Sequence, residues 1–352
     1  MSAALEVSEL GEGDYGAWDA FVAGSPDGSA YALTGYLEAL TAATGEGFRI
    51  LAARRGGELV AGLPLREWRR GALRAAGPRL LLYYMSPVFR AWETRYPSQR
   101  TSRHVEALTA LAEGVDRLGY DRVNLRCRPT VTDVRPLLAR GWKAEPGYTY
   151  VARLTDLEGL RGRMEQNLRR LVDRCERAGL TLAEDDDFPA FYRLHTEALR
   201  RQDQPPYLRE PAFREFLERL RRGGLCRLFF ARAPDGAPAA MQLVLTGSHP
   251  VTHTVCAGAD AEYQKLGASA FLRWRSFEAL AASGHAANDL TDATLNRVTH
   301  FKSQLGADLE PCHVVTSPTT LRWRMAEARE GAMRGARSLA SRALRRTRTE
   351  GE

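Results

Sequence analysis

The residues best suited to chemistry lie in the second half of the chain. Residues 264–269 read Gln-Lys-Leu-Gly-Ala-Ser, after a β-rich run and before a long helical pattern. A glycine turn at a helix start leaves backbone N–H groups unpaired, and such groups attract phosphate. The Q-x-x-G-x-S spacing is short and weakly specific. It predicts a cofactor-binding turn formed by Gln264, Lys265, Gly267, Ala268 and Ser269.

A carboxylate follows this turn at the end of a predicted short strand, residues 287–290. Asp289 is placed there as a proton acceptor or, equally, as the cap of the next turn. The sequence has no Ser/His/Asp or Cys/His spacing that predicts a nucleophile, no H-E-x-x-H and no P-loop. We therefore expect neither a metal site nor a covalent intermediate.

The stretch around Asp289 is similar in sequence to an earlier stretch of the chain. With one offset of 165 residues and no gaps, Gly119–Pro146 aligns with Gly284–Pro311. A predicted β-hairpin over residues 48–63 is matched by a second over 227–241. We interpret this as an internal duplication of two αβ lobes of roughly 150 residues each. Chance similarity between two αβ units is the alternative.

This order of elements resembles a known acyltransferase family. A hairpin, a strand, a Q-x-x-G-x-S turn, a helix, a strand and a helix resemble the GNAT lobe. Two such lobes, with Phe301-Lys302-x-x-Leu-Gly near the end of the second, resemble the FemAB family, also described as FemX-type or BioF2-like. The resemblance covers about residues 20–316. It implies an α/β fold of two tandem GNAT-like lobes, with mixed sheets flanked by helices, joined by a long basic helix.

The predicted divisions are a first lobe at 1–154, the linking helix at 155–179, a second lobe at 180–316 and a basic helical tail at 317–352. The linking helix rests on apolar residues at helical spacing between Leu160 and Ala178. An apolar strand is also predicted over residues 79–88. The acidic run Glu184–Asp187 is interpreted as a helix N-terminus.

The resemblance implies roles for several residues. Phe301 and Lys302 are implied to be catalytic with Asp289, Lys302 supplying a cation for a phosphate or a developing negative charge. Ser269 stands where Gly or Ala is usual, which weakens the case for tight coenzyme A contact. The implied substrate-binding residues are Tyr36, Tyr83, Ser86, Arg169, Arg170 and Tyr207. The alternatives to these substrate-binding roles are structural: aromatic side chains packed in the core, a helix cap and a solvent-exposed basic face of a helix.

Three functions remain open at this point. The first is transfer of an aminoacyl group from aminoacyl-tRNA to an amine of a cell-wall (peptidoglycan) precursor or a peptide-like small molecule. The second is an acyl-CoA-dependent N-acyltransferase, and the third is a non-catalytic binding member. The first lobe lacks a Q-x-x-G-x-S counterpart, which favours one donor site. We expect no tightly bound cofactor, the acyl donor being aminoacyl-tRNA or acyl-CoA.

Charge and composition limit the partners. The 352 residues carry a formal net charge of +7, of which nine Arg and four Glu after residue 320 contribute +5. Basicity therefore belongs mainly to the tail, which could contact tRNA or an anionic membrane surface, or have no fixed partner. A DNA-binding core is not expected. No apolar run approaches roughly 20 residues, and five dispersed cysteines favour a reducing compartment. We expect a cytoplasmic protein, with peripheral contact at the inner face of the membrane as an option.

Overall fold

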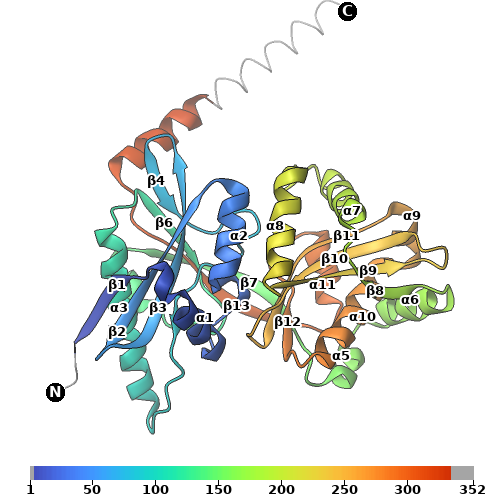
Figure 1. Cartoon of the computed structure of the whole chain (residues 1–352), viewed down its shortest axis with the longest axis horizontal. Coiled ribbons are helices and arrows are strands. Elements are labelled where there is room, and N and C mark those ends of the chain that lie inside the picture. The colour runs from blue at the N-terminus through green and yellow to red at the C-terminus, as the bar shows by residue number, and fades with distance from the viewer. Residues whose placement is uncertain (1–3, 334–352) are drawn as a thin grey trace, which may run out of the picture.

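The structure, a computed structural model that describes residues 4–333, consists of two α/β lobes lying side by side (Figure 1). The strands of the first half are β1 (Leu5–Glu9), β2 (Gly47–Arg55), β3 (Glu58–Arg70), β4 (Leu73–Ala76), β5 (Val88–Phe89), β6 (Arg122–Arg126) and β7 (Lys143–Arg153). Its helices are α1 (Tyr15–Gly24), α2 (Thr34–Thr44), α3 (Pro97–Arg117) and α4 (Arg135–Leu138).

The second half repeats this plan. Its strands are β8 (Thr181–Glu184), β9 (Cys226–Arg232), β10 (Pro238–Leu245), β11 (Val251–Ala259), β12 (Ala287–Asp289) and β13 (Asp308–Thr316). Its helices are α5 (Leu157–Arg163), α6 (Gln166–Arg177), α7 (Phe188–Arg200), α8 (Glu210–Arg222), α9 (Ala261–Leu266), α10 (Ala268–Ala282) and α11 (Arg297–Ser303). The expected fold class, two tandem lobes of mixed sheet and flanking helices, is confirmed.

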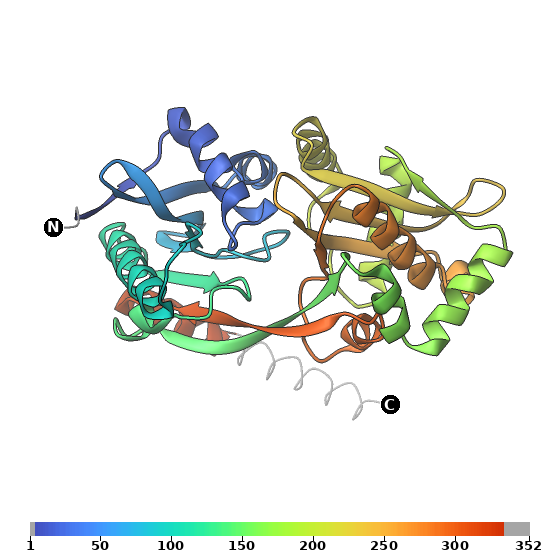
Figure 2. The ribbon, with the colours of Figure 1, turned by 90° about the horizontal axis from the view of Figure 1, so that it is seen from below.

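The two lobes exchange their last strands. β7 pairs with β12 of the second lobe, and β13 returns to pair with β6 of the first, giving the central order β6-β13-β7-β12. All of β13 pairs antiparallel with β7, and the two strands run together from one lobe to the other (Figure 2). Each sheet is therefore completed by a strand from the other half of the chain. The predicted lobe ends at residues 154 and 316 divide the sequence but do not separate two independent sheets.

The exchange preserves the symmetry of the repeat. Cys312 pairs with Gly147, its own counterpart at the offset of 165 residues. The register of β6 with β13 matches that of β12 with β7 after the same shift. Gly119 and Gly284, which follow α3 and α10, both adopt a left-handed conformation with φ of 65° and 85°. These features support the duplication.

Most of the local predictions are confirmed. The two hairpins are β2–β3 and β9–β10, each antiparallel around a short turn. Helix α7 begins directly after the acidic run, where a helix N-terminus was predicted. Asp187 caps α7 by accepting the N–H of Ala190 at 3.0 Å, so the acidic run does mark a helix start.

The single helix predicted over residues 160–178 is wrong. The helix is interrupted between α5 and α6, because Met164 has an extended backbone (φ −65°, ψ 136°). The Met164 side chain is buried, at 2% exposure. Glu165 then donates its N–H to the Gln304 carbonyl at 2.9 Å. Both helices pack on α10, so this segment belongs to the second lobe instead of standing between the lobes.

The strand predicted over residues 79–88 is also wrong. Leu80 has a positive φ of 54°, and Met85 forms only one isolated bridge, with Arg126. Pairing starts only at Val88, in β5. Prolines near both ends of the segment deny it the N–H groups that a strand ladder needs.

One buried core joins the two lobes. Residues of α2 and α3 share it with residues of α7, α8, β9 and β10. Tyr36 of α2 meets Phe216 of α8 edge-on, with ring centroids 5.9 Å apart. The walls between the lobes are therefore packed like an interior, which fixes the side chains that face one another there.

The described part of the C-terminal segment is a helix over residues 321–333, beside β4 (Figure 1). Trp323 is 2% exposed and packs edge-on against Trp68 with ring centroids 5.7 Å apart. Glu327 forms an ion pair of 3.0 Å with Arg122. The rest of the predicted tail, 334–352, lies outside the described residues. Within residues 4–333, none of the helices has the length and apolar character needed to cross a membrane.

Candidate active site between the lobes

Asp289 lies where the exchanged strands meet. It ends β12, between β11 and β7, and its register partner on β7 is Val151. The side chain is 1% exposed. A carboxylate is costly to bury unless several donors satisfy it, so its neighbours determine its charge.

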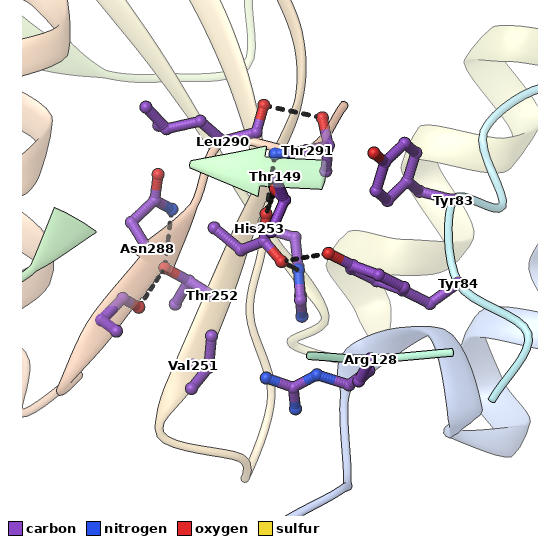
Figure 3. A network of polar contacts seen from close by, with 12 residues as sticks. Tyr83, Tyr84, Arg128, Thr149, Val251, Thr252, His253, Asn288, Leu290 and Thr291 are labelled. Carbon is purple, nitrogen blue, oxygen red and sulfur yellow. Dashed lines mark hydrogen bonds and ion pairs between the residues drawn. The ribbon is translucent and has the colours of Figure 1, made fainter. Parts of the chain in front are cut away.

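Donors from both lobes satisfy this carboxylate. The Tyr84 hydroxyl of the first lobe donates to Oδ2 at 2.8 Å, and the Thr149 hydroxyl on β7 donates to Oδ1 at 2.5 Å. The Thr291 N–H also donates to Oδ1, at 2.8 Å. His253 on β11 places Nδ1 3.5 Å from Oδ2. Figure 3 shows the Tyr84 ring reaching across from the first lobe toward His253.

These contacts keep Asp289 ionised. Burial alone would raise its pKa, but His253, Thr149 and Tyr84 outweigh burial and hold the pKa at about 2. Burial lowers the pKa of His253, so this imidazole is neutral at pH 7. Among residues 4–333, both ring nitrogens of His253 and the nearby Tyr31 hydroxyl have no hydrogen-bond partner. The site thus contains a fixed negative charge surrounded by neutral groups.

A cavity of about 500 Å³ opens beside Asp289 between the lobes. The first lobe contributes the turn after α1 and residues 128–130, and the second contributes His249, Val251 and Asp289. Glu310 on β13 and Arg153 on β7 line it as well and form an ion pair. Its volume is that of a small-molecule site, which lies in the range of roughly 300–1,000 Å³.

The two carboxylates of the cavity differ in acidity. Burial raises the pKa of Glu310, and the nearby Asp289 carboxylate adds to the rise. The pKa of Asp289 is lowered instead. Carboxylates whose environments separate their pKa values can take different roles, one as a fixed charge and one as a proton acceptor.

Lys302 lies on the other side of the turn that follows β12. Its Nζ donates to the carbonyl of Thr291, which has a positive φ of 51°, and to the carbonyl of Asp292 at 2.8 Å. Burial lowers the pKa of Lys302 to about 8, and the Arg273 guanidinium of α10 adds to this. The adjacent Phe301 packs against the second-lobe core. Lys302 thus holds the turn next to Asp289 and still carries a positive charge near neutral pH.

Arg273 is a second buried cation in this region. It is 6% exposed, and burial lowers its pKa to about 10. In the described chain, its Nε and Nη1 have no hydrogen-bond partner and its guanidinium forms no ion pair. A buried arginine without a counter-ion is costly. Arg273 and Lys302 together make this end of the second lobe attractive to an anion.

The predicted cofactor-binding turn is covered by a neighbouring helix, α6, which the sequence does not indicate. Residues 264–266 are the last turn of α9, and Gly267 (φ 111°) starts α10. A side chain at Gly267 would come within 2.7 Å of Leu171 on α6. Arg174 of α6 donates to the carbonyls of Lys265 and Leu266. Ala268 is completely buried, whereas Ser269 is half-buried and Gln264 is exposed. Packing against α6 is therefore one reason for the glycine.

The structure brings together only part of the predicted substrate set. Tyr83 lies under Arg126, whose guanidinium carbon is 4.1 Å from the ring centroid, and next to Tyr84. Ser86 accepts the Arg128 N–H at 3.0 Å at the cavity edge. The other four residues do not contact Asp289. Tyr36 is one ring removed from the site, because it packs on Tyr31 with ring centroids 5.3 Å apart and Tyr31 packs on His253 at 4.8 Å. Tyr207 packs against His195, and Arg169 and Arg170 lie on α6 at the far end of the second lobe (Figure 1).

Sequence reasoning missed several residues of the site. Tyr84, not Tyr83, reaches Asp289, and strand alternation could not select between them. His253 stands between Thr252 and Thr254, so the strand pattern does not single it out. Arg128, Thr149 and Glu310 carry no local signal, because only the exchange of β7 and β13 brings them to Asp289. The described residues hold no group of three His, Cys, Asp or Glu suited to a metal ion, and all five cysteines are buried and unpaired.

The arrangement suits chemistry on an amine. The Asp289 carboxylate can hold an ammonium, and Glu310 can accept a proton in the same cavity. Buried cations at Lys302 and Arg273 can meet negative charge on the acyl donor, where a low dielectric strengthens their effect.

Comparison with known proteins agrees with this architecture. The family model described as "Acetyltransferase (GNAT) domain" matches residues 162–303, from α5 to the end of α11. A comparison with curated protein sequences finds no match.

Among solved structures, FemX superposes with a TM-score of 0.68 at 14% identity, over 88% of this chain and 96% of that one. L-PGS from Bacillus licheniformis gives 0.58 at 13% identity, over 91% and 96%. A tandem GNAT protein from the clavulanic acid biosynthesis pathway gives 0.53 at 15% identity, over 90% and 100%. At such identities the likeness concerns the fold, tandem lobes included. Residues 162–303 therefore match a GNAT acetyltransferase domain, and the whole chain has a tandem fold similar to that of FemX.

Proposed function

We propose that the protein transfers an aminoacyl group from aminoacyl-tRNA to an amine bound in the cavity between the lobes. The observation that carries this proposal is the ionised Asp289 carboxylate, held by Tyr84 of one lobe and Thr149 of the exchanged strand, at the wall of that cavity. Such a carboxylate attracts a primary ammonium and orients it.

In the proposed reaction the amine nitrogen attacks the ester carbonyl of the donor. Glu310, whose pKa burial raises, accepts the proton that the amine loses. The charge that develops on the carbonyl oxygen is stabilised from the Lys302 side of the site. The amide C–N bond forms and the ester C–O bond breaks. The leaving oxygen takes the second proton that the nitrogen loses, so the tRNA departs with a terminal hydroxyl. No residue is acylated on the way.

One observation favours a tRNA donor over coenzyme A. The predicted cofactor-binding turn around Gly267 is covered by α6, whose Arg174 donates to its carbonyls. Arg273 and Lys302 offer buried positive charge to an anionic donor of either kind.

Acyl-CoA remains the second candidate donor, because residues 162–303 match an acetyltransferase domain. The test mixes the purified protein with tRNA charged with labelled amino acids, or with labelled acetyl-CoA, and a small-amine extract. We expect label to move from tRNA into small amine products. Movement of label from coenzyme A alone would replace the tRNA proposal with the acetyltransferase alternative.

A further inference from the structure

Arg128 is a buried cation on the first-lobe side of the cavity. It is 4% exposed and lies directly after β6, at the cavity wall. Of the five N–H donors of its guanidinium, the one hydrogen bond found is from Nη1 to the Gly28 carbonyl. Its Nε has no partner among residues 4–333, and it forms no ion pair there.

The backbone of Arg128 is held in place. Its N–H donates to Ser86 Oγ at 3.0 Å, and Ser86 Oγ itself donates to the Pro87 carbonyl at 3.1 Å. Figure 3 shows the guanidinium extended toward Val251, below His253. Packing does not require a charge here, because an unpaired buried guanidinium costs more than an apolar side chain of its size. An anion in the cavity would offset this cost.

The charges along the cavity wall are balanced but not all paired. Arg153 is paired with Glu310. In the described part of the chain, Asp289 meets only neutral hydrogen-bond donors, and Arg128 meets no carboxylate at ion-pair distance. Asp27 and Glu310 lie within electrostatic reach of Arg128 but form no ion pair with it. The cavity therefore offers one negative and one positive group that each lack a permanently charged partner at ion-pair distance. A ligand with one cation and one anion matches both.

We propose that the acceptor is a small zwitterionic amine, an amino acid or a short peptide, whose carboxylate is bound by Arg128 while its ammonium lies at Asp289. This inference rests on the proposed function and names the acceptor class for the same cavity. A volume of about 500 Å³ suits a molecule of this size. A carboxylate matches the guanidinium fork in a bidentate manner. A phosphate dianion fits less well, because Asp289 and Glu310 share the cavity.

The experiment measures binding without any donor, so it does not depend on catalysis. Isothermal calorimetry compares the twenty proteinogenic amino acids with their C-terminal amides, and phosphoserine with serine. The variants are Arg128→Met, which removes the charge, and Arg128→Lys, which keeps it and guards against misfolding. Arg90→Met is the matched control, since Arg90 is a first-lobe arginine at 40% exposure, paired with Glu58.

We expect at least one amino acid to bind about tenfold or more tighter than its amide, as for a charge-assisted bidentate pair. Arg128→Met should bring the two affinities together, Arg128→Lys should keep part of the difference, and Arg90→Met should change nothing. Equal binding of acids and amides, no binding by any member, or a difference that survives Arg128→Met would overturn the inference. A preference for phosphoserine over serine that depends on Arg128 would overturn the carboxylate assignment.

Transfer is then measured separately with the same compounds. Arg128-dependent binding without transfer from either donor would overturn the proposed function and leave the acceptor class intact. Transfer to neutral amines as fast as to amino acids would overturn the acceptor class and leave the proposed function intact.

Discussion

Replacing Arg273 with methionine should stabilise the fold and impair transfer. Arg273 is buried on α10 without an ion pair in the described structure, and its pKa is lowered to about 10. Keeping the guanidinium charged in that environment costs about 3 kcal/mol, from the change in pKa. Methionine keeps much of the length and packing without the charge. We therefore expect Arg273→Met to raise the free energy of unfolding by about 1–3 kcal/mol.

The assay is urea denaturation followed by tryptophan fluorescence, with transfer measured on the same preparation. Arg275→Met is the matched control, because Arg275 lies on the same helix, is 38% exposed and is paired with Glu176 at 3.0 Å and Glu278 at 2.8 Å. Its loss should cost less than about 1 kcal/mol. A loss of stability in Arg273→Met would refute the reasoning, since it would mean that the guanidinium has a stabilising partner. Unchanged transfer would remove Arg273 from the donor site.

Three further predictions concern other parts of the molecule. Because the pKa of Asp289 is lowered to about 2, its charge stabilises the fold at neutral pH and this contribution fades as the pH falls from about 4 to 2. Asp289→Asn should be about 2 kcal/mol less stable than the parent at pH 6 in urea, with the gap narrowing below pH 4. Transfer should decline above pH 8 as Lys302 loses its proton, and Lys302→Arg should remove that decline in a pH–rate profile. Trp323→Ala should cost about 3 kcal/mol in thermal unfolding, whereas the exposed Leu321→Ala should cost almost nothing.

Each of these has a clear contrary result. A stability gap that stays constant from pH 6 to 3 would show that the Asp289 charge is not what stabilises the site. A decline above pH 8 that persists in Lys302→Arg would assign the titration to another group. A harmless Trp323→Ala would mean that the C-terminal helix does not contribute to the first lobe.

How far the sequence predicted the fold depends on the range of the interactions. The two hairpins and the start of α7 follow from local turn and cap signals, and the structure has them where they were predicted. The break at Met164 has no local signal, because it comes from a tertiary contact between Glu165 and Gln304. The same holds for residues 79–88, whose apolar character reflects burial instead of strand pairing.

The strand exchange could not be predicted for a different reason. Two copies of one sequence pattern allow β7 to pair with the end of its own lobe or with that of the other, and local pattern does not choose. Asp289 was found because it ends a strand, a position visible in the sequence. Arg128, Thr149 and Glu310 reach the cavity only through the exchange. Asn124, the counterpart of Asp289 at the offset of 165 residues, carries no charge, so the duplicated lobe lacks an equivalent site.

The most direct test of the central claim is single-turnover transfer of a labelled aminoacyl group from charged tRNA to an amine by the parent protein and Asp289→Asn. Asp308→Asn, which removes an exposed carboxylate of β13 at 56% exposure, is the control. We predict that Asp289→Asn lowers the rate at least about 100-fold, the range for a positioned acid–base or charge role, while the control keeps the parent rate. Transfer at the parent rate by Asp289→Asn would contradict a reaction centred on the cavity between the lobes.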